Sequence, residues 1–260
     1  MTGSTRSSAL AEFLAAVSFL TRLPVPGPAA WNPAIHGRSM AWYPFVGLLL
    51  GIAGAVLYRI ATGLGMPDWP AAVATIAALL WLTGAVHAAG LADFADAMAG
   101  VRPSERWLAL LPGRRLGGPG AAVLVLSQAL RVSFVALLAE PRPVLLALVG
   151  ALAASHGFLA LLAGLLPPSG SDRLFASLGG PGRARALAAG LIGASLSVTA
   201  GYRLGGPNTA LLAPLVGLAA TWLVGRFALH RQGGLTGDAL GAAQQAAEIF
   251  ILLLFLLRLP

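Results

Sequence analysis

The stretch VLLALVGALAASHGFLALLAGLL, residues 144–166, contains no charged side chain and exceeds the roughly 20 residues with which a helix crosses a bilayer. Six further apolar runs share this character: Met40–Tyr58, Trp69–Val86, Leu116–Ala139, Ala186–Tyr202, Thr209–Val224 and Ala242–Leu257. None of the runs alternates polar and apolar residues as a membrane β-strand does. Because two of them are short, we predict an all-α, polytopic helical membrane bundle with about six to seven transmembrane helices.

The overall composition excludes an ordinary soluble domain. Hydrophobic residues make up 57% of the 260 residues and charged residues 10%, whereas soluble domains are about 45–50% apolar. With no repeat visible, residues 1–260 are expected to form a single integral-membrane domain. The chain start lacks the apolar core of a cleavable signal peptide, and Ala9–Leu20 is predicted to be an amphipathic helix on the membrane surface. The absence of cysteine excludes disulfides, a thiolate nucleophile and a Cys-ligated zinc.

The 17 arginines, with no lysine beside them, alternate between the gaps that separate the apolar runs. Counted before, between and after the runs they number 3, 1, 4, 1, 3, 1, 2 and 1, and Arg131 lies inside the third run. Short loops rich in arginine stay cytoplasmic. We therefore predict a cytoplasmic N-terminus, an outward C-terminus and polar chemistry on the cytoplasmic face. Positive loops of this kind mark orientation in a lipid bilayer, and they do not indicate nucleic acid.

The first polar cluster is HAAGLADFAD, residues 87–96. Asp93 and Asp96 are three residues apart, so in a helix their carboxylates project from one face. Two converging carboxylates repel each other unless a cation lies between them, and oxygen ligands suit Mg²⁺. A pair of ordinary solvated acids is the alternative, and the spacing alone favours it. His87 is either a substrate contact or a structural histidine at a helix end.

The second polar cluster is GGLTGDALG, residues 233–241, directly before the last apolar run. A helix that begins here presents free N–H groups and a positive dipole end, which attract phosphate. Thr236 could cap this helix while Asp238 binds a metal ion. A glycine-rich turn with an ordinary capping residue is the alternative.

Two charged residues fall inside apolar runs. Glu248 follows Asp238 by ten residues, or about 15 Å of helix, which places a carboxylate within the membrane, where charge is costly and usually functional. Arg131 could pair with Glu248, pair with Asp93 or Asp96, or reach a phosphate, and the sequence does not decide between these.

Five motifs together resemble those of the cobalamin synthase family, the adenosylcobinamide-GDP ribazoletransferases. They are FLTRLPVP at Phe19–Pro26, YPFVG at Tyr43–Gly47, the segment Thr83–Asp96, RRLGGPG at Arg114–Gly120, and the segment Gly233–Glu248. They occur in the family's order across nearly the whole chain, and the last is the most specific.

The resemblance implies a Mg²⁺-dependent transferase of late cobalamin biosynthesis in the bacterial cytoplasmic (inner) membrane, with its active face cytoplasmic. It would join adenosylcobinamide-GDP to α-ribazole or its phosphate and release GMP. The resemblance makes Asp93, Asp96 and Asp238 the catalytic and metal-binding residues. It makes candidate substrate contacts of His87, Arg22, Arg115, Arg131, Thr236, Gly237 and Glu248. It also allows a homo-oligomer or a B12-assembly complex.

The chain departs from the family pattern at three places. The family typically reads His-Leu-Asp-Gly where this chain reads His87-Ala-Ala89-Gly90, so an aspartate is missing four residues before Asp93. The loop at 111–117 lacks an acid, and His156 stands where an arginine is expected. A weakly active or inactive relative that binds corrinoid is therefore an alternative. A membrane transporter is a more remote one, since transport predicts polar groups along a path across the bilayer or paired broken helices in repeated halves.

Overall fold

The computed structural model describes residues 8–25, 33–100 and 116–257, and every regular element within these ranges is a helix. In chain order they are α1 (Ala9–Leu20), α2 (Pro33–Ser39), the 3-10 helix η2 (Met40–Trp42), α3 (Tyr43–Gly63), α4 (Asp68–Leu82), α5 (Val86–Met98), α7 (Gly118–Leu138), α8 (Pro141–Leu165), α9 (Arg173–Leu178), α10 (Arg183–Gln232) and α11 (Gly237–Leu257). The all-α prediction is confirmed.

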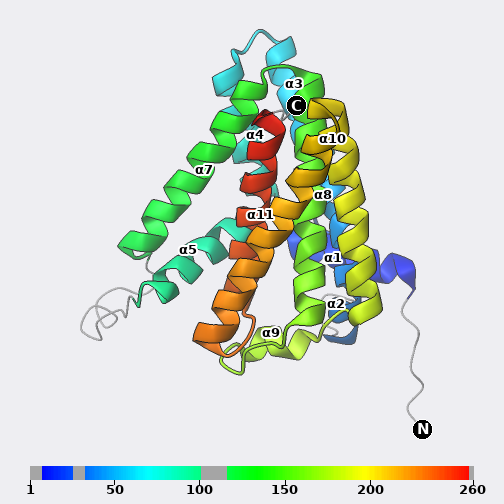
Figure 1. Ribbon diagram of the computed structural model, residues 1–260, viewed down its shortest axis with the longest axis vertical. Coiled ribbons are helices and arrows are strands. Elements are labelled where there is room, and N and C mark those ends of the chain that lie inside the picture. Colours follow the sequence, from blue (N-terminus) through cyan, green and yellow to red (C-terminus); the bar gives the residue numbers. More distant parts are fainter. Residues whose placement is uncertain (1–7, 26–32, 101–115, 258–260) are drawn as a thin grey trace.

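The number of membrane passes depends on two broken helices. Five described helices are long and apolar enough to cross a membrane, or six if α4 and α5, which meet at an 85° bend, form one span. α10 counts once here, although it bends at Gly206, where φ is 81°. A Cβ at Gly201 would lie only 2.9 Å from the backbone of Ala210, whereas a straight helix would separate these residues by about 13 Å. α10 is therefore a helical hairpin (Figure 1), and counting its two arms separately gives six passes, or seven if α4 and α5 form one span, within the predicted range.

α8 lies at the centre of the bundle and packs against α3, α10 and α11. Small residues bring these helices together. Gly51 of α3 would place a Cβ 2.8 Å from the backbone of Leu148, and Gly193 of α10 would place one 2.6 Å from the carbonyl oxygen of Ala153. Such glycines let membrane helices approach closely where lipid supplies no hydrophobic drive for association.

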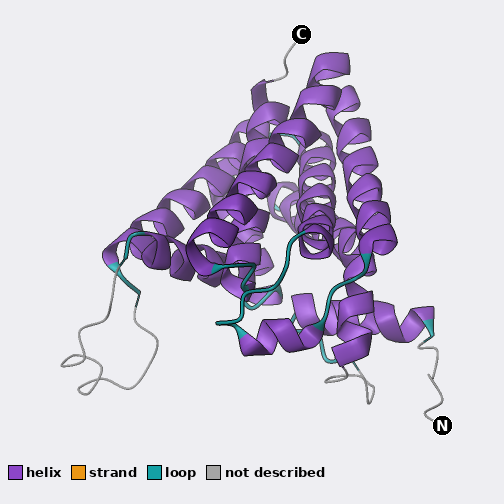
Figure 2. Cartoon of the chain, turned by 60° about the horizontal axis from the view of Figure 1, so that its bottom comes forward, coloured by secondary structure: helices purple, strands orange, loops and turns teal. Residues whose placement is uncertain are grey.

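The two ends of the bundle differ in what they carry. α1, α2 and α9 lie together across one end (Figure 2), which we call the α9 end. α1 has the bounds predicted for the interfacial helix, and its buried Glu12 lies 3.6 Å from Arg185 of α10. The opposite end, which we call the far end, carries the short α3–α4 and α7–α8 turns.

Candidate active site

α5 and α11 cross at two glycines near the α9 end. A Cβ at Gly90 would lie 3.2 Å from both the Cα of Gly241 and the carbonyl oxygen of Asp238, and a Cβ at Gly241 would lie 3.0 Å from the carbonyl oxygen of His87. Two backbones pass this closely only where side chains are absent. The crossing therefore joins the two polar clusters of the sequence, because His87 and Asp238 both lie beside it.

The bend between α4 and α5 positions the start of α5. Gly84 and Ala85 both have left-handed backbone angles, with φ of 64° and 55°. The N–H of Arg22 donates to the carbonyl oxygen of Leu82 at 2.7 Å. The Arg22 guanidinium lies against Gly84, where a Cβ would meet its Nε at 2.8 Å. Arg22, a predicted substrate contact, thus lies beside the first turn of α5.

The N-terminus of α11 is capped as predicted. The N–H of Ala239 donates to the Thr236 hydroxyl at 3.1 Å, and that hydroxyl lies 3.3 Å from Oε1 of Gln232 at the end of α10. Thr236 is therefore the capping residue, which satisfies one of the free N–H groups of the first turn. Its predicted contact with substrate stays a prediction.

Asp172, an acid to which the sequence assigns no role, holds α9 against α11. Asp172 accepts the N–H of Phe175 at 2.9 Å and the N–H of Gly237 at 3.0 Å. The adjoining segment Pro167–Ser169 pairs with Leu235 through backbone hydrogen bonds of 2.8 and 2.7 Å. Asp directly before a short helix is an N-cap signal, but the bond to Gly237 joins residues far apart in the chain.

Asp96 is attached to the start of α7. Its Oδ2 accepts the N–H of Gly117 at 2.6 Å and its Oδ1 accepts the N–H of Gly120 at 2.7 Å. A carboxylate at a helix N-terminus is favoured by the free N–H groups and by the helix dipole. Asp96 therefore has a structural role that the sequence did not reveal. Because carboxylate oxygens accept more than one bond, its predicted part in metal binding stays a prediction.

A cavity of about 410 Å³ lies beside the crossing. Three predicted site residues line it, His87, Gly237 and Asp238. Ala89 lines it too, at the position where the family reads aspartate. Tyr43, the first residue of α3, also lines the cavity and is 3% exposed. Tyr43 belongs to the YPFVG motif, and the sequence alone assigns it no role.

The predicted metal ligands do not form a closed cluster. Asp238 stands at the crossing and Asp93 follows Gly90 by one turn of α5, and both are half-buried. Among the described residues, no group of three or more His, Asp or Glu side chains is placed to hold a metal ion. Mg²⁺ often binds through one or two carboxylates, with waters and substrate phosphates completing its shell. The Mg²⁺ site stays a prediction.

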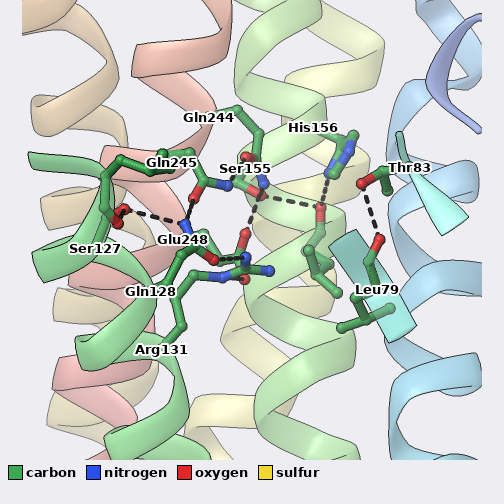
Figure 3. Close-up of polar contacts among 12 residues, drawn as sticks. Leu79, Thr83, Ser127, Gln128, Arg131, Ser155, His156, Gln244, Gln245 and Glu248 are labelled. Atoms are coloured by element: carbon green, nitrogen blue, oxygen red, sulfur yellow. Dashed lines mark hydrogen bonds and ion pairs between the residues drawn. The ribbon is translucent and has the colours of Figure 1, made fainter. Parts of the chain in front are cut away.

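Arg131 and Glu248 pair with each other inside the bundle (Figure 3). The Arg131 Nε donates to Oε1 of Glu248 at 2.8 Å, and the two residues are 3% and 0% exposed. Of the partners that the sequence left open for Arg131, Glu248 is therefore the one that it contacts. Gln244 donates to the other oxygen of Glu248 at 2.8 Å and to Ser155 at 3.1 Å. Substrate contact by Arg131 or Glu248 stays a prediction.

Two further glutamines extend this pair into a layer. Gln128 accepts from Arg131 at 2.8 Å and donates to Gln245 at 3.2 Å, and Gln245 donates to Gln244 at 2.7 Å. We call this set the polar layer, and it consists of Gln128, Arg131, Ser155, Gln244, Gln245 and Glu248. Three of its hydrogen bonds link different helices: Arg131–Glu248 and Gln128–Gln245 join α7 to α11, and Gln244–Ser155 joins α11 to α8.

His87 lies between the polar layer and the cavity. Its ring meets that of His156 edge-on, with centroids 5.0 Å apart. The Nδ1 of His156 lies 2.8 Å from the carbonyl oxygen of Leu152, and its Nε2 is buried with no hydrogen-bond partner among the described residues. His87 is 8% exposed and lines both the cavity and the small pocket beside Arg131. Arg115, the remaining predicted contact, lies outside the described residues.

These features define a polytopic helical membrane protein whose candidate active site lies at one end of its bundle. The sequence model of the cobalamin-5-phosphate synthase family matches residues 12–256, which is nearly the whole chain. The chain therefore belongs to the cobalamin-5-phosphate synthase family.

Similar curated proteins carry one name, adenosylcobinamide-GDP ribazoletransferase. That of Bradyrhizobium diazoefficiens is 39% identical over 250 residues, covering 94% of this chain and 92% of its own length. The proteins of Mesorhizobium japonicum and Azorhizobium caulinodans are 37% and 36% identical, covering 90% and 95% of this chain and 88% and 96% of their own. No solved structure matches the chain.

Proposed function

We propose that this chain is an adenosylcobinamide-GDP ribazoletransferase, an enzyme of cobalamin synthesis. The observation that carries the proposal is the similarity to relatives of that name over 90–95% of the chain. The geometry supports it as well, because both polar clusters of the sequence meet at one cavity, which His87 and Asp238 line.

In the proposed reaction a ribose hydroxyl of α-ribazole, or of its phosphate, attacks the phosphorus that carries the adenosylcobinamide group. A new O–P bond forms, the bond from that phosphorus to GMP breaks, and the hydroxyl proton passes to a basic group of the site. Such transfers depend on positioning and charge neutralisation more than on covalent chemistry. The crossing of α5 and α11 would supply that positioning, because its glycines hold two backbones at fixed separation.

A divalent cation suits the acids of this site. Asp93 and Asp238 would hold Mg²⁺ together with substrate phosphate oxygens, and the ion would neutralise charge at the reacting phosphorus. Asp96 would contribute chiefly by fixing the N-terminus of α7 beside α5, through its bonds to Gly117 and Gly120.

We further propose that the chain lies in the bacterial inner membrane with its α9 end in the cytoplasm. The distribution of described arginines supports this orientation. Arginines near the α9 end are Arg22, Arg38, Arg173, Arg183, Arg185, Arg226 and Arg231, and those near the far end are Arg59, Arg142 and Arg203. Both substrates would then reach the candidate site from the cytoplasm.

The test is Mg²⁺-dependent release of GMP from adenosylcobinamide-GDP and α-ribazole by the full chain in liposomes. Wild type should turn over, and Asp238→Asn should lower the rate by about 100-fold or more, the scale for losing one electrostatic contact to a transferring group. Asp68→Asn is the matched control, since it removes a carboxylate at the far end.

No release by wild type, with release appearing in Ala89→Asp, would overturn the proposal. It would show a family member whose scaffold persists while its catalytic acid is lost, because Ala89 lines the cavity where that carboxylate would stand.

A further inference from the structure

We propose that the cavity at the α5–α11 crossing binds the aromatic nucleoside part of the acceptor, α-ribazole, and that adenosylcobinamide-GDP stays outside it. The inference rests on the proposed function, which names the two substrates. It assigns each of them to a different part of the site.

The size of the cavity separates the two substrates. Pockets for small organic ligands measure about 300–1,000 Å³, and this one, at about 410 Å³, lies near the lower limit. A benzimidazole riboside is a ligand of that small class. A corrinoid joined to guanosine diphosphate is several times larger, so it does not fit inside.

Two largely buried residues line the cavity with polar side chains that form no hydrogen bond within the described part of the chain. Tyr43 is 3% exposed and His87 is 8% exposed, and neither forms a hydrogen bond with any described residue. Among the described residues, the fully buried side-chain atoms without a hydrogen-bond partner are His156 Nε2 and Ser197 Oγ, so the polar atoms of Tyr43 and His87 remain accessible to a bound molecule. A nucleoside suits them, because its ribose hydroxyls and ring nitrogen can bond to a phenol and an imidazole.

The remaining walls suit a flat aromatic base. The rings of Phe19 and Tyr43 are stacked, with centroids 6.3 Å apart and planes 11° from parallel. Phe175 of α9 lines another side, and the buried side chains of Leu20 and Met40 complete an apolar surface. Aromatic rings and aliphatic side chains of this kind bury a heteroaromatic base favourably.

The charged residues around the cavity indicate that the diphosphate of adenosylcobinamide-GDP lies outside it. Among the described residues that line the cavity, Asp238 is the only one with a full charge, and it is negative. A diphosphate requires cationic partners such as guanidinium groups. Arg22 lies against Gly84 of the cavity wall, so the diphosphate belongs at the edge of the cavity, where Arg22 and the ion that Asp238 would hold supply positive charge.

The test is calorimetric titration of the full chain in lipid nanodiscs with α-ribazole, in the absence of the second substrate. Wild type should bind α-ribazole, and Tyr43→Phe should weaken binding by about 3- to 10-fold, the loss expected for one hydrogen bond. Tyr58→Phe is the matched control on the same helix, because the Tyr58 hydroxyl already lies 2.8 Å from Asp68 and 2.9 Å from the Ala139 carbonyl oxygen. It should bind α-ribazole as wild type does.

Equal affinity of wild type and Tyr43→Phe for α-ribazole would overturn the inference, as would displacement of α-ribazole by GMP. The release assay separates this outcome from failure of the proposed function. If GMP is released and Tyr43→Phe changes the KM for adenosylcobinamide-GDP alone, the function stands and the assignment is wrong. If α-ribazole binds through Tyr43 but no GMP is released, the nucleoside site stands and the function is wrong.

Discussion

The polar layer and the cavity lie on either side of His87, and they differ in how far their polar side chains are hydrogen-bonded. In the layer, Glu248 uses both carboxylate oxygens and Gln244 uses both ends of its amide. In the cavity, Tyr43 and His87 form no hydrogen bond with a described residue. Hydrogen-bond saturation, more than residue type, therefore separates the polar layer from Tyr43 and His87.

α3 shows the same contrast within one residue type. Tyr58, near its far end, has Asp68 and the Ala139 carbonyl oxygen as acceptors for its hydroxyl. Tyr43, at its α9 end, lines the cavity without a partner. Both are almost completely buried, so burial alone does not reveal which tyrosine has a hydroxyl available to a ligand.

The largest effect is expected in the polar layer. Glu248→Ala leaves Arg131 buried without its counter-ion, which should lower the free energy of unfolding by about 3–5 kcal/mol. Thermal unfolding of the purified chain in detergent measures this. The double variant Arg131→Met, Glu248→Met is the control, and it should recover much of the loss because no charge stays buried. An unchanged melting temperature for Glu248→Ala would show that the layer is not structural.

Gly241→Ala should disturb the crossing of α5 and α11. Its Cβ would lie 3.0 Å from the carbonyl oxygen of His87, so one of the two backbones must give way by a few tenths of an ångström, at a cost of about 1–3 kcal/mol. Gly63→Ala is the control, since a Cβ there meets nothing within 4 Å. Melting temperatures of the two variants should separate, and GMP release should fall only in Gly241→Ala. Equal behaviour would mean that the close crossing is unimportant.

A smaller effect on stability is expected at Asp96, where two substitutions separate capping from metal binding. Asp96→Ala removes both hydrogen bonds to the start of α7 and should cost about 0.5–2 kcal/mol. Asp96→Asn retains a capping side chain and should unfold near the wild-type temperature. If the Asn variant keeps its stability but needs far more Mg²⁺ for GMP release, Asp96 binds metal as well as capping α7. Destabilisation by Asn as large as by Ala would contradict the capping role.

The membrane passes were predictable because lipid accepts only long apolar helices with internally satisfied backbones. The bend between α4 and α5 could not be predicted, because the apolar run Trp69–Val86 continues across it without interruption. Gly84 and Ala85 are small and apolar, so hydropathy continues where the backbone turns left-handed. Hydropathy thus finds the spans and misses the break that positions His87.

The candidate site was predictable only where its contacts are local. Thr236 caps a helix that starts beside it, so its role could be inferred from neighbouring residues. The bonds from Asp96 to Gly117 and from Asp172 to Gly237 join residues far apart in the chain. The cavity arises from helices that meet only in the folded bundle, which is why Tyr43 had no predicted role.

The most direct test of this contrast compares two carboxylates on α11, one from each region. Asp238→Asn and Glu248→Gln make the same chemical change ten residues apart, and each variant is measured for melting temperature and for GMP release per folded molecule. The account predicts that Asp238→Asn melts close to wild type and loses release, while Glu248→Gln melts lower and its folded fraction still releases GMP. A stable Glu248→Gln without activity, beside an Asp238→Asn that works at the wild-type rate, would contradict it.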